Sequence, residues 1–335
     1  MQTNKTVALV LGSGGARGYA HIGVIEELEA RGYEIICVSG CSMGALVGGV
    51  YAAGQLKAFK EWVTRLDYLD VLRLVDITWS PMGAMRGERV MEVISDLLAG
   101  MRIEDLPIAF TTVATDLLEQ KEVWFQEGSL ETAIRASIAV PGVITPVHAG
   151  NRILVDGGLV NPLPIIPTVS SHADLILAVN VTAQKGRATL NELMPDWIKR
   201  HRTPDMQQPA KGLSEWVKRV QGLAGQLLNK QASNEVLKEI KTEEQTPLGS
   251  EMNWSKLDLM LQSFEITQAA LAQYKMAGYP PDIVVEIPKT VCAGYEFHKA
   301  PELIELGRRM ARDVLDNYEQ VTPLPGGDLD DILGV

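Results

Sequence analysis

Cysteine is scarce in this chain of 335 residues, which contains only Cys37, Cys41 and Cys292. Three thiols cannot build the disulfide framework of a small secreted domain. None of them lies in a CxxC or CxxxxH pattern typical of a metal site. The cysteine content therefore predicts a reducing, cytoplasmic location and no metal.

Positive charge is also in short supply, because the formal net charge is −11 and the sequence pI is about 5.1. A protein that coats duplex nucleic acid needs a basic surface to replace the counterions of the phosphates. Nucleic acid is therefore not expected as a partner.

Long hydrophobic runs are few. Only Val7–Leu11 follows Lys5 before glycines begin, which is too short for a signal peptide. The 22 uncharged residues between Glu34 and Lys57 are long enough to cross a bilayer. Because five glycines interrupt them, we favour a buried strand, a tight turn and a buried helix over a membrane span.

The remaining pattern alternates strands and helices, which predicts an α/β fold with a mainly parallel sheet. Several apolar runs are nearly continuous, as in strands that are covered on both faces. The predicted strands are Val7–Leu11, Ile35–Val38, Ile108–Ala114, Glu122–Phe125, Ile153–Val155, Leu175–Val181 and Ile283–Ile287. The predicted helices are Gly18–Ala30, Ser42–Ala53, Glu88–Leu98, Pro162–Ser171 and Leu257–Lys275.

The composition changes after about residue 184. Residues 185–244 carry 11 basic and 8 acidic residues in an otherwise acidic chain, and residues 213–227 have the apolar spacing of an amphipathic helix. We predict a catalytic domain over 5–183 and 251–320, a helical and locally basic insertion over 184–250, and a mobile tail over 321–335. The insertion is either a surface helix packed on the core or a lid or membrane-docking element.

The chemistry begins at Ser42, in the sequence Gly40-Cys41-Ser42-Met43-Gly44. This is the G-x-S-x-G pattern of a nucleophile on a tight turn between a strand and a helix. Side chains at Gly40 and Gly44 would collide across such a turn, and the N-terminus of the following helix favours developing negative charge. A structural glycine turn is the alternative.

A glycine-rich loop, Gly12-Ser13-Gly14-Gly15-Ala16-Arg17-Gly18, follows the first predicted strand. Its backbone N–H groups can converge on one point, as an oxyanion hole requires. A dinucleotide fingerprint does not fit, because G-x-G-x-x-G needs glycine where Arg17 stands, and no P-loop Gly-Lys-Ser/Thr follows. Arg17 either steadies the loop or meets an anionic headgroup, and we favour the structural role.

The general base is less obvious. None of the five histidines lies in a motif that suggests a base, although His148 is a possible reserve. Asp156 follows a predicted strand directly and precedes Gly157-Gly158, and active-site groups of open α/β sheets gather at strand ends. A plain β-turn is an equally good interpretation of Asp-Gly-Gly.

Together these segments resemble the patatin-like phospholipases, and the resemblance covers most of residues 5–185. It includes the glycine loop, the Ser42 turn, Ile134–Val147 and Val155–Pro164. Residues 70–90 and 273–283 more narrowly resemble the small bacterial RssA-type members. The resemblance implies a three-layer α/β/α sandwich that hydrolyses fatty acyl esters of lipids without a metal or other cofactor.

The resemblance also implies a serine–aspartate dyad without histidine. Ser42 would be the nucleophile, Asp156 the base, and the amides of Gly14, Gly15 and Ala16 the oxyanion hole. Residues 128–137 and Pro141 would shape the wall of the pocket. Two other functions stay open, namely a regulatory or binding module with little turnover and an acyltransferase that uses the same serine. The oligomeric state, the lipid headgroup and the chain length are not predicted.

Overall fold

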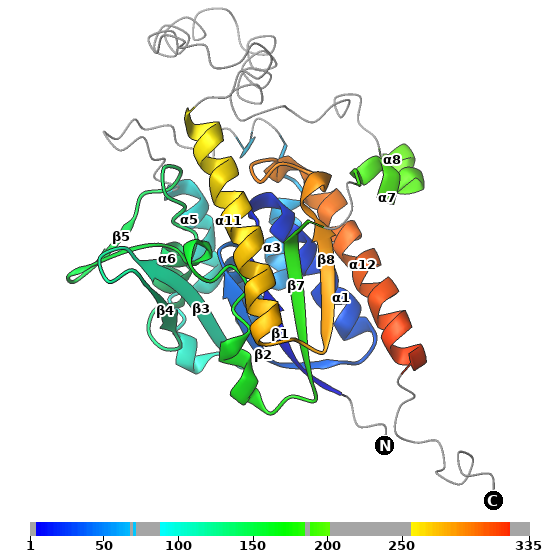
Figure 1. Ribbon diagram of the computed structural model, residues 1–335, viewed down its shortest axis with the longest axis horizontal. Helices are drawn as coiled ribbons and strands as arrows, with labels where there is room; N and C mark the ends of the chain where they lie inside the picture. Colours follow the sequence, from blue (N-terminus) through cyan, green and yellow to red (C-terminus); the bar gives the residue numbers. More distant parts are fainter. Residues whose placement is uncertain (1–4, 68–69, 72–87, 185–187, 202–255, 322–335) are drawn as a thin grey trace, which may run out of the picture.

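A twisted, eight-stranded sheet forms the centre of the protein in a computed structural model (Figure 1). The structure describes residues 5–67, 70–71, 88–184, 188–201 and 256–321. The strands are β1 (Thr6–Leu11), β2 (Glu34–Cys41), β3 (Ala109–Asp116), β4 (Lys121–Phe125), β5 (Val147–Ala149), β6 (Arg152–Asp156), β7 (Leu175–Ala183) and β8 (Ile283–Pro288).

The strand order is β5-β6-β3-β2-β1-β7-β8, and β4 pairs with β3 off this path. The pairs β1–β2, β1–β7, β2–β3 and β7–β8 are parallel, whereas β4, β5 and β6 join antiparallel. The mainly parallel sheet predicted from the apolar runs is confirmed. All seven predicted strands are present, and β5 is an additional strand of three residues.

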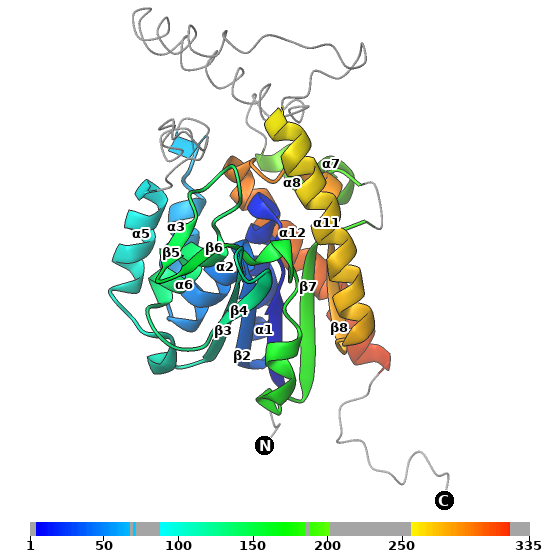
Figure 2. The same cartoon turned by 60° about the vertical axis from the view of Figure 1, so that its left-hand side comes forward.

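Helices cover both faces of the sheet, which gives three layers (Figures 1 and 2). The α-helices are α1 (Ala20–Ala30), α2 (Met43–Ala52), α3 (Leu56–Val63), α5 (Glu88–Leu98), α6 (Leu130–Ser137), α7 (Leu190–Leu193), α8 (Pro195–His201), α11 (Lys256–Gly278) and α12 (Ala300–Val321). The 3-10 helices are η1 (Gly15–Tyr19), η2 (Ile103–Asp105), η3 (Gly157–Leu159), η4 (Ile166–Ser171), η6 (Lys289–Val291) and η7 (Phe297–Lys299).

The alternation of side chains along the central strands explains the layers. In β1, Leu9 and Leu11 enter the large core shared with α1, α2 and α12, whereas Val10 enters a smaller core on the opposite face. That second core also contains Ala272 of α11. Because successive side chains of a strand point to opposite faces, a continuous apolar run can satisfy helices on both sides.

One predicted helix is largely wrong. Residues 162–171 were expected to be helical throughout, but only the 3-10 helix η4 forms there. Pro162, Pro164 and Pro167 lack the backbone N–H that an α-helix needs and restrict the residues before them.

The last described helix, α12, packs closely against α1. A Cβ on Gly23 of α1 would lie 1.9 Å from the carbonyl oxygen of Ile304, and one on Gly307 of α12 would lie 2.0 Å from that of Ala20. The two glycines therefore let the helix backbones approach each other.

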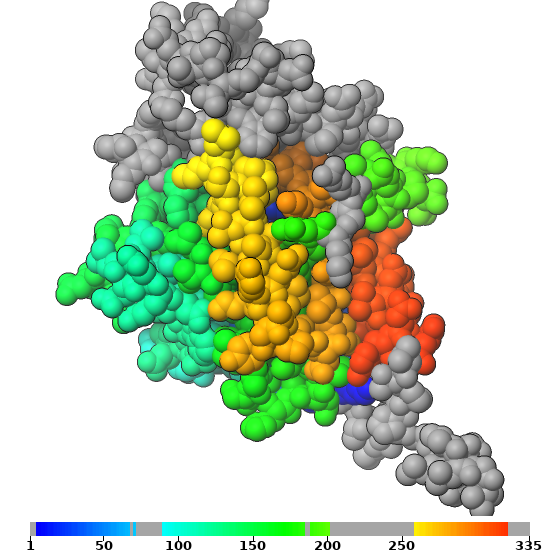
Figure 3. All heavy atoms as spheres, viewed as in Figure 1, coloured from blue at the N-terminus to red at the C-terminus, as the bar shows by residue number. Residues whose placement is uncertain are grey.

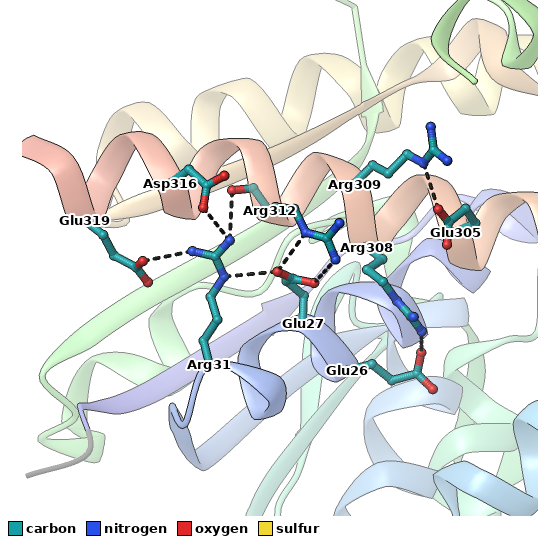
Figure 4. Close-up of polar contacts among 9 residues, drawn as sticks. All are labelled: Glu26, Glu27, Arg31, Glu305, Arg308, Arg309, Arg312, Asp316 and Glu319. Atoms are coloured by element: carbon teal, nitrogen blue, oxygen red, sulfur yellow. Dashed lines mark hydrogen bonds and ion pairs between the residues drawn. The ribbon is translucent and has the colours of Figure 1, made fainter. Parts of the chain in front are cut away.

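Ion pairs flank this contact between α1 and α12 (Figure 4). The buried carboxylate of Glu27 accepts hydrogen bonds from Arg31 and Arg312, and Arg31 also pairs with Asp316 and Glu319. Both arginines hold the pKa of Glu27 below its ordinary value, against the opposing effect of burial.

Much of the predicted insertion and the predicted tail lie outside the described residues, as do the amphipathic pattern at 213–227 and most of residues 70–90. Only α7 and α8 are described within 184–250. The strand β8, which follows the insertion in the chain, pairs in parallel with β7, which precedes it. The proposed division into domains stays a prediction.

Candidate active site

Ser42 stands on a sharp turn between the end of β2 and the start of α2. Its backbone has φ 55° and ψ −121°, a conformation that few non-glycine residues adopt. A Cβ on Gly40 would lie 2.4 Å from the carbonyl oxygen of Gly44, and one on Gly44 would lie 2.1 Å from that of Leu11. Both predicted glycines are therefore required by close backbone contacts around Ser42.

Asp156 reaches the same turn from the opposite direction because of the register of β3. Cys41, the last residue of β2, lies beside Val113, and Asp156, the last residue of β6, lies beside Ala114. Strand β4 occupies the other edge of β3, so β2 and β6 share one edge and meet end to end. This meeting of the two strands makes Ser42 and Asp156 neighbours, although they lie 114 positions apart in the chain.

The Asp156 carboxyl group is fully buried and partly satisfied. Its Oδ1 accepts a hydrogen bond from the N–H of Gly158 at 2.7 Å, and the Cys41 thiol lies 4.0 Å from the same oxygen. Its Oδ2 has no conventional hydrogen-bond partner among the described residues. The carboxyl group of Asp156 therefore accepts the hydrogen bond of its own turn and is at the same time enclosed beside the Ser42 turn.

Burial raises the pKa of Asp156 to about 7, and contacts with the Ser42 hydroxyl and the Gly158 amide limit the rise. A carboxyl group with this pKa is a much stronger base than an exposed aspartate and is still substantially ionised at neutral pH. Near neutral pH, Asp156 is therefore present in both its protonated and its ionised form.

The glycine loop runs beside the Ser42 turn. A Cβ on Gly18 would lie 2.3 Å from Cγ of Met43, the residue after Ser42. At its start, the amides of Gly12 and Ser13 donate to the carbonyls of Val179 and Pro162. The loop is thus held against the sheet at one end and against α2 at the other.

The amides of this loop differ in their partners. Ala16 donates its N–H to the carbonyl of Gly294 at 2.8 Å, so this amide is not free to bind an oxyanion in this structure. A loop distant in the chain already uses the donor of Ala16, and the place of this amide in the oxyanion hole stays a prediction. Within the part of the chain that the structure describes, the N–H groups of Gly14 and Gly15 donate to no protein acceptor.

Comparisons with known proteins identify the family of this chain. A family model described as patatin-like phospholipase matches residues 9–169, which include Ser42, the glycine loop and Asp156. An uncharacterized NTE family protein of Mycobacterium bovis is 39% identical over 95% of this chain and 93% of its own length. The chain belongs to the patatin-like phospholipase family.

Two more distant similarities complete the comparison. The lysophospholipase NTE1 of Kluyveromyces lactis is 31% identical over 56% of this chain, a match that covers 13% of the yeast protein. VipD from Legionella pneumophila aligns with a TM-score of 0.45 and 13% identity, over 94% of this chain and 67% of VipD. The latter likeness is too weak to carry an argument.

Arg17 has a structural position in this patatin-like site. Its side chain is 2% exposed and donates to the carbonyls of Gly14 and Lys289 and to the carboxylate of Glu265. These contacts are those of a residue that steadies the loop, which is the role the sequence favoured.

Two histidines lie in very different places. His148 is exposed in the edge strand β5, opposite Ile153, and is not in a position comparable to that of the buried Asp156. His21 is fully buried, and its Nε2–H donates to the carbonyl of Gly12 at 2.8 Å. Burial lowers the pKa of His21 to about 4, so its neutral form supports the glycine loop.

Ser137 lies beside Ser42, and the sequence indicated no role for it except as part of the expected pocket wall. The N–H of Ser42 donates to Oγ of Ser137 at 2.9 Å, and this hydroxyl donates to the carbonyl of Val113 at 2.7 Å. Ser137 is fully buried at the end of α6. The only sequence signal for it is its place in the segment that resembles the family.

In the described ranges there is no cluster of three or more His, Cys, Asp or Glu side chains suited to holding a metal ion. None of the helices in those ranges combines the length and the apolar character that crossing a membrane requires.

Proposed function

We propose that this patatin-like protein is a serine acyl hydrolase that cleaves fatty acyl esters of lipids, with Ser42 as nucleophile and Asp156 as general base. The observation that carries the proposal is the meeting of a strained serine with a buried carboxyl group whose pKa is about 7. Further support comes from the family and from the name of the yeast relative, which is a lysophospholipase.

In the first half of the reaction, Ser42 Oγ attacks the ester carbonyl carbon while its proton passes to Asp156. The carbonyl oxygen becomes an oxyanion, which the N–H groups of Gly14 and Gly15 and the N-terminus of α2 stabilise. When the tetrahedral intermediate collapses, Asp156 returns the proton to the departing alcohol oxygen. The product at Ser42 is an acyl ester.

In the second half, a water molecule attacks the acyl carbonyl carbon and gives its proton to Asp156. Collapse of the second tetrahedral intermediate releases the fatty acid, and Asp156 returns the proton to Ser42 Oγ. A positioned general base contributes about 10²–10⁴ in rate, and each oxyanion donor about 10²–10³.

The decisive experiment combines labelling with turnover. A fluorophosphonate probe should label the wild type at Ser42, and p-nitrophenyl acyl esters should be hydrolysed. The Ser42→Ala variant should lose both reactions, and Asp156→Asn should lose nearly all turnover. His148→Ala is the control and should keep the wild-type rate.

Other outcomes identify other functions. No labelling of the folded protein would favour the regulatory or binding module. Labelling with transfer of the acyl group to an acceptor instead of free fatty acid would indicate an acyltransferase. Loss of activity in His148→Ala alone would replace the dyad with a triad.

Peripheral membrane contact is a second part of the proposal, because an enzyme that cleaves a lipid ester reaches its substrate at the membrane surface. It is based on the locally basic insertion, most of which lies outside the described residues. Co-sedimentation with anionic liposomes should decrease when residues 205–245 are deleted, and unchanged pelleting would remove that role from the segment.

A further inference from the structure

Helix α11 lies along the outer side of the sheet, across β7, with one side on the molecular surface (Figures 1 and 3). On the side of α11 that faces the protein interior, the side chains of Glu265 and Gln268 reach the glycine loop. Glu265 accepts from Arg17 at 2.7 Å, and Gln268 Nε2 donates to Oγ of Ser13 at 2.9 Å. Residues three apart in a helix share one side, so both contacts come from the same side of α11.

The contact with Arg17 determines how one peptide group is oriented. Arg17 Nε donates to the carbonyl oxygen of Gly14 at 3.1 Å. In a planar trans peptide the following N–H, that of Gly15, points in the opposite direction from this carbonyl. Holding the Gly14 oxygen on Arg17 therefore directs the Gly15 N–H away from Arg17.

Glu265 in turn holds Arg17. The guanidinium group is buried, and Glu265 is the one carboxylate that pairs with it among the described residues. A buried cation without its partner is strongly disfavoured and would seek other contacts. Glu265 also packs against Gly294, where a Cβ would lie 3.0 Å from Oε1, and the carbonyl of Gly294 accepts the Ala16 N–H.

Gln268 contacts both the glycine loop and the loop that follows Asp156. It is 3% exposed, and besides its bond to Ser13 it packs on Gly158, where a Cβ would lie 2.0 Å from Nε2. The N–H of Gly158 is the donor to Asp156 Oδ1. One carboxamide thus links the glycine loop to the loop that carries the general base.

We infer that Glu265 and Gln268 are positioning residues, which hold the Gly14 and Gly15 amides in the orientation that binds the oxyanion. Glu265 acts through Arg17, and Gln268 acts through Ser13. The inference rests on the proposed hydrolase function. It adds a role for α11, which follows the insertion in the chain and sets the geometry of the oxyanion hole.

The test uses two variants and two matched controls in the full chain. Glu265→Gln removes the charge that holds Arg17, and Gln268→Met removes the hydrogen bond to Ser13 with little change in shape. Glu305→Gln is the first control, because Glu305 has the same 25% side-chain exposure and pairs with Arg309 at 2.7 Å on α12, away from the loop (Figure 4). Gln273→Met, at an exposed position of α11, is the second.

The readout compares a p-nitrophenyl ester with its thionoester, in which sulfur replaces the carbonyl oxygen. Sulfur accepts hydrogen bonds weakly, so an intact oxyanion hole favours the oxygen ester. We expect both variants to lower kcat about 10-fold to 100-fold with little change in KM, and to lower the oxygen-to-sulfur rate ratio about 10-fold. The controls should keep the wild-type ratio.

Several results would overturn the inference. If both variants keep the wild-type kcat and the wild-type oxygen-to-sulfur rate ratio, the inference is wrong. Fluorophosphonate labelling of Ser42 would in that case still support the proposed hydrolase. A lower kcat with an unchanged ratio would indicate a merely structural role. Absence of labelling and turnover in the wild type would overturn the hydrolase and this inference together. If Glu265→Gln does not fold, the ratio for Gln268→Met decides.

Discussion

Ser42 and Asp156 are both buried, at 6% and 0% exposure, and each is held by a neighbouring residue, which is distant in the chain for Ser42 and two positions away for Asp156. Ser42 is tied through its amide to Ser137, and Asp156 through its carboxyl group to Gly158. Enclosure makes the aspartate basic, and it also makes its ionised form unfavourable. At the scale of single residues, reactivity and stability therefore oppose each other at this site.

The pH dependence of Asp156 follows from that conflict. As the proposed general base, Asp156 must be ionised, so kcat/KM of the wild type should rise with pH and level off above a midpoint near pH 7. The measurement is a pH profile with a p-nitrophenyl ester between pH 5 and 9. A profile that is flat across pH 7 would contradict the assignment of the base.

The contribution of Asp156 to the stability of the protein should fall with rising pH, whereas the activity should rise. Its folded-state pKa of about 7 lies above the ordinary value of 3.8, so its contribution to stability is present below about pH 4 and is lost as the pH rises through 7. Asp156→Asn removes this loss. We expect the variant to unfold at a higher temperature than the wild type at pH 8 and to have a smaller advantage at pH 5, by calorimetry.

Ser137→Ala tests the residue that orients the Ser42 turn. Without the hydroxyl, the N–H of Ser42 and the carbonyl of Val113 both lose a buried partner. We expect a loss of about 1–3 kcal/mol in the free energy of unfolding and a lower kcat. Denaturant unfolding and ester turnover measure both, and Ser137→Thr, which keeps the hydroxyl, should retain more of the activity.

At the scale of elements, the site depends on strands that end opposite one another and on helices that lock the layers. Strands β2 and β6 run toward each other along one edge of β3, and this brings two distant loops together. On the other side of the molecule, α12 closes the sandwich by packing its backbone against α1 at Gly23 and Gly307.

Gly307→Ala should loosen the pair α1–α12. A methyl group there would meet the carbonyl of Ala20 at 2.0 Å, so the helices must separate, at a cost of about 1–3 kcal/mol. Gly278→Ala is the matched control, because a Cβ at Gly278 of α11 meets nothing within 4 Å. We expect a lower melting temperature for the first variant only. Equal melting temperatures would show that the helix contact is not tight.

For the whole molecule, the buried histidines predict sensitivity to acid. Burial lowers the pKa of His21 to about 4 and that of His298 to about 3, below the ordinary value of 6.5. Folding then disfavours their protonation, so stability is complete above pH 6.5 and is lost as the pH falls toward 4. For His21 this loss is on the order of 3 kcal/mol.

His21→Gln should reduce this sensitivity, since the Gln amide can still donate to Gly12 but does not titrate. The measurement is the melting temperature between pH 7 and pH 4. Asp156 acts in the opposite direction over part of this range, so the comparison is made in an Asp156→Asn background. The same pH slope with and without His21→Gln would contradict the prediction.

Much of the fold follows from local patterns in the chain. Apolar runs, several of them nearly continuous, predicted seven strands, and the stretch of uncharged residues around Ser42 proved to be a strand, a turn and a helix. Helix α12 was missed, although Leu303, Leu306, Met310 and Val314 have helical spacing among its many charges. Strand β5 has only three residues, too few for a pattern.

By itself, the sequence determined which segments have special backbone geometry. Glycines at 40 and 44 predicted the turn at Ser42, because steric exclusion acts between residues close in the chain. The tertiary structure alone decided the partners. It enclosed Asp156 beside Ser42, engaged the Ala16 amide and put Glu265 on Arg17. Those contacts join residues about 100 to 280 positions apart, and their pairing depends on strand register and layer packing that no local pattern encodes.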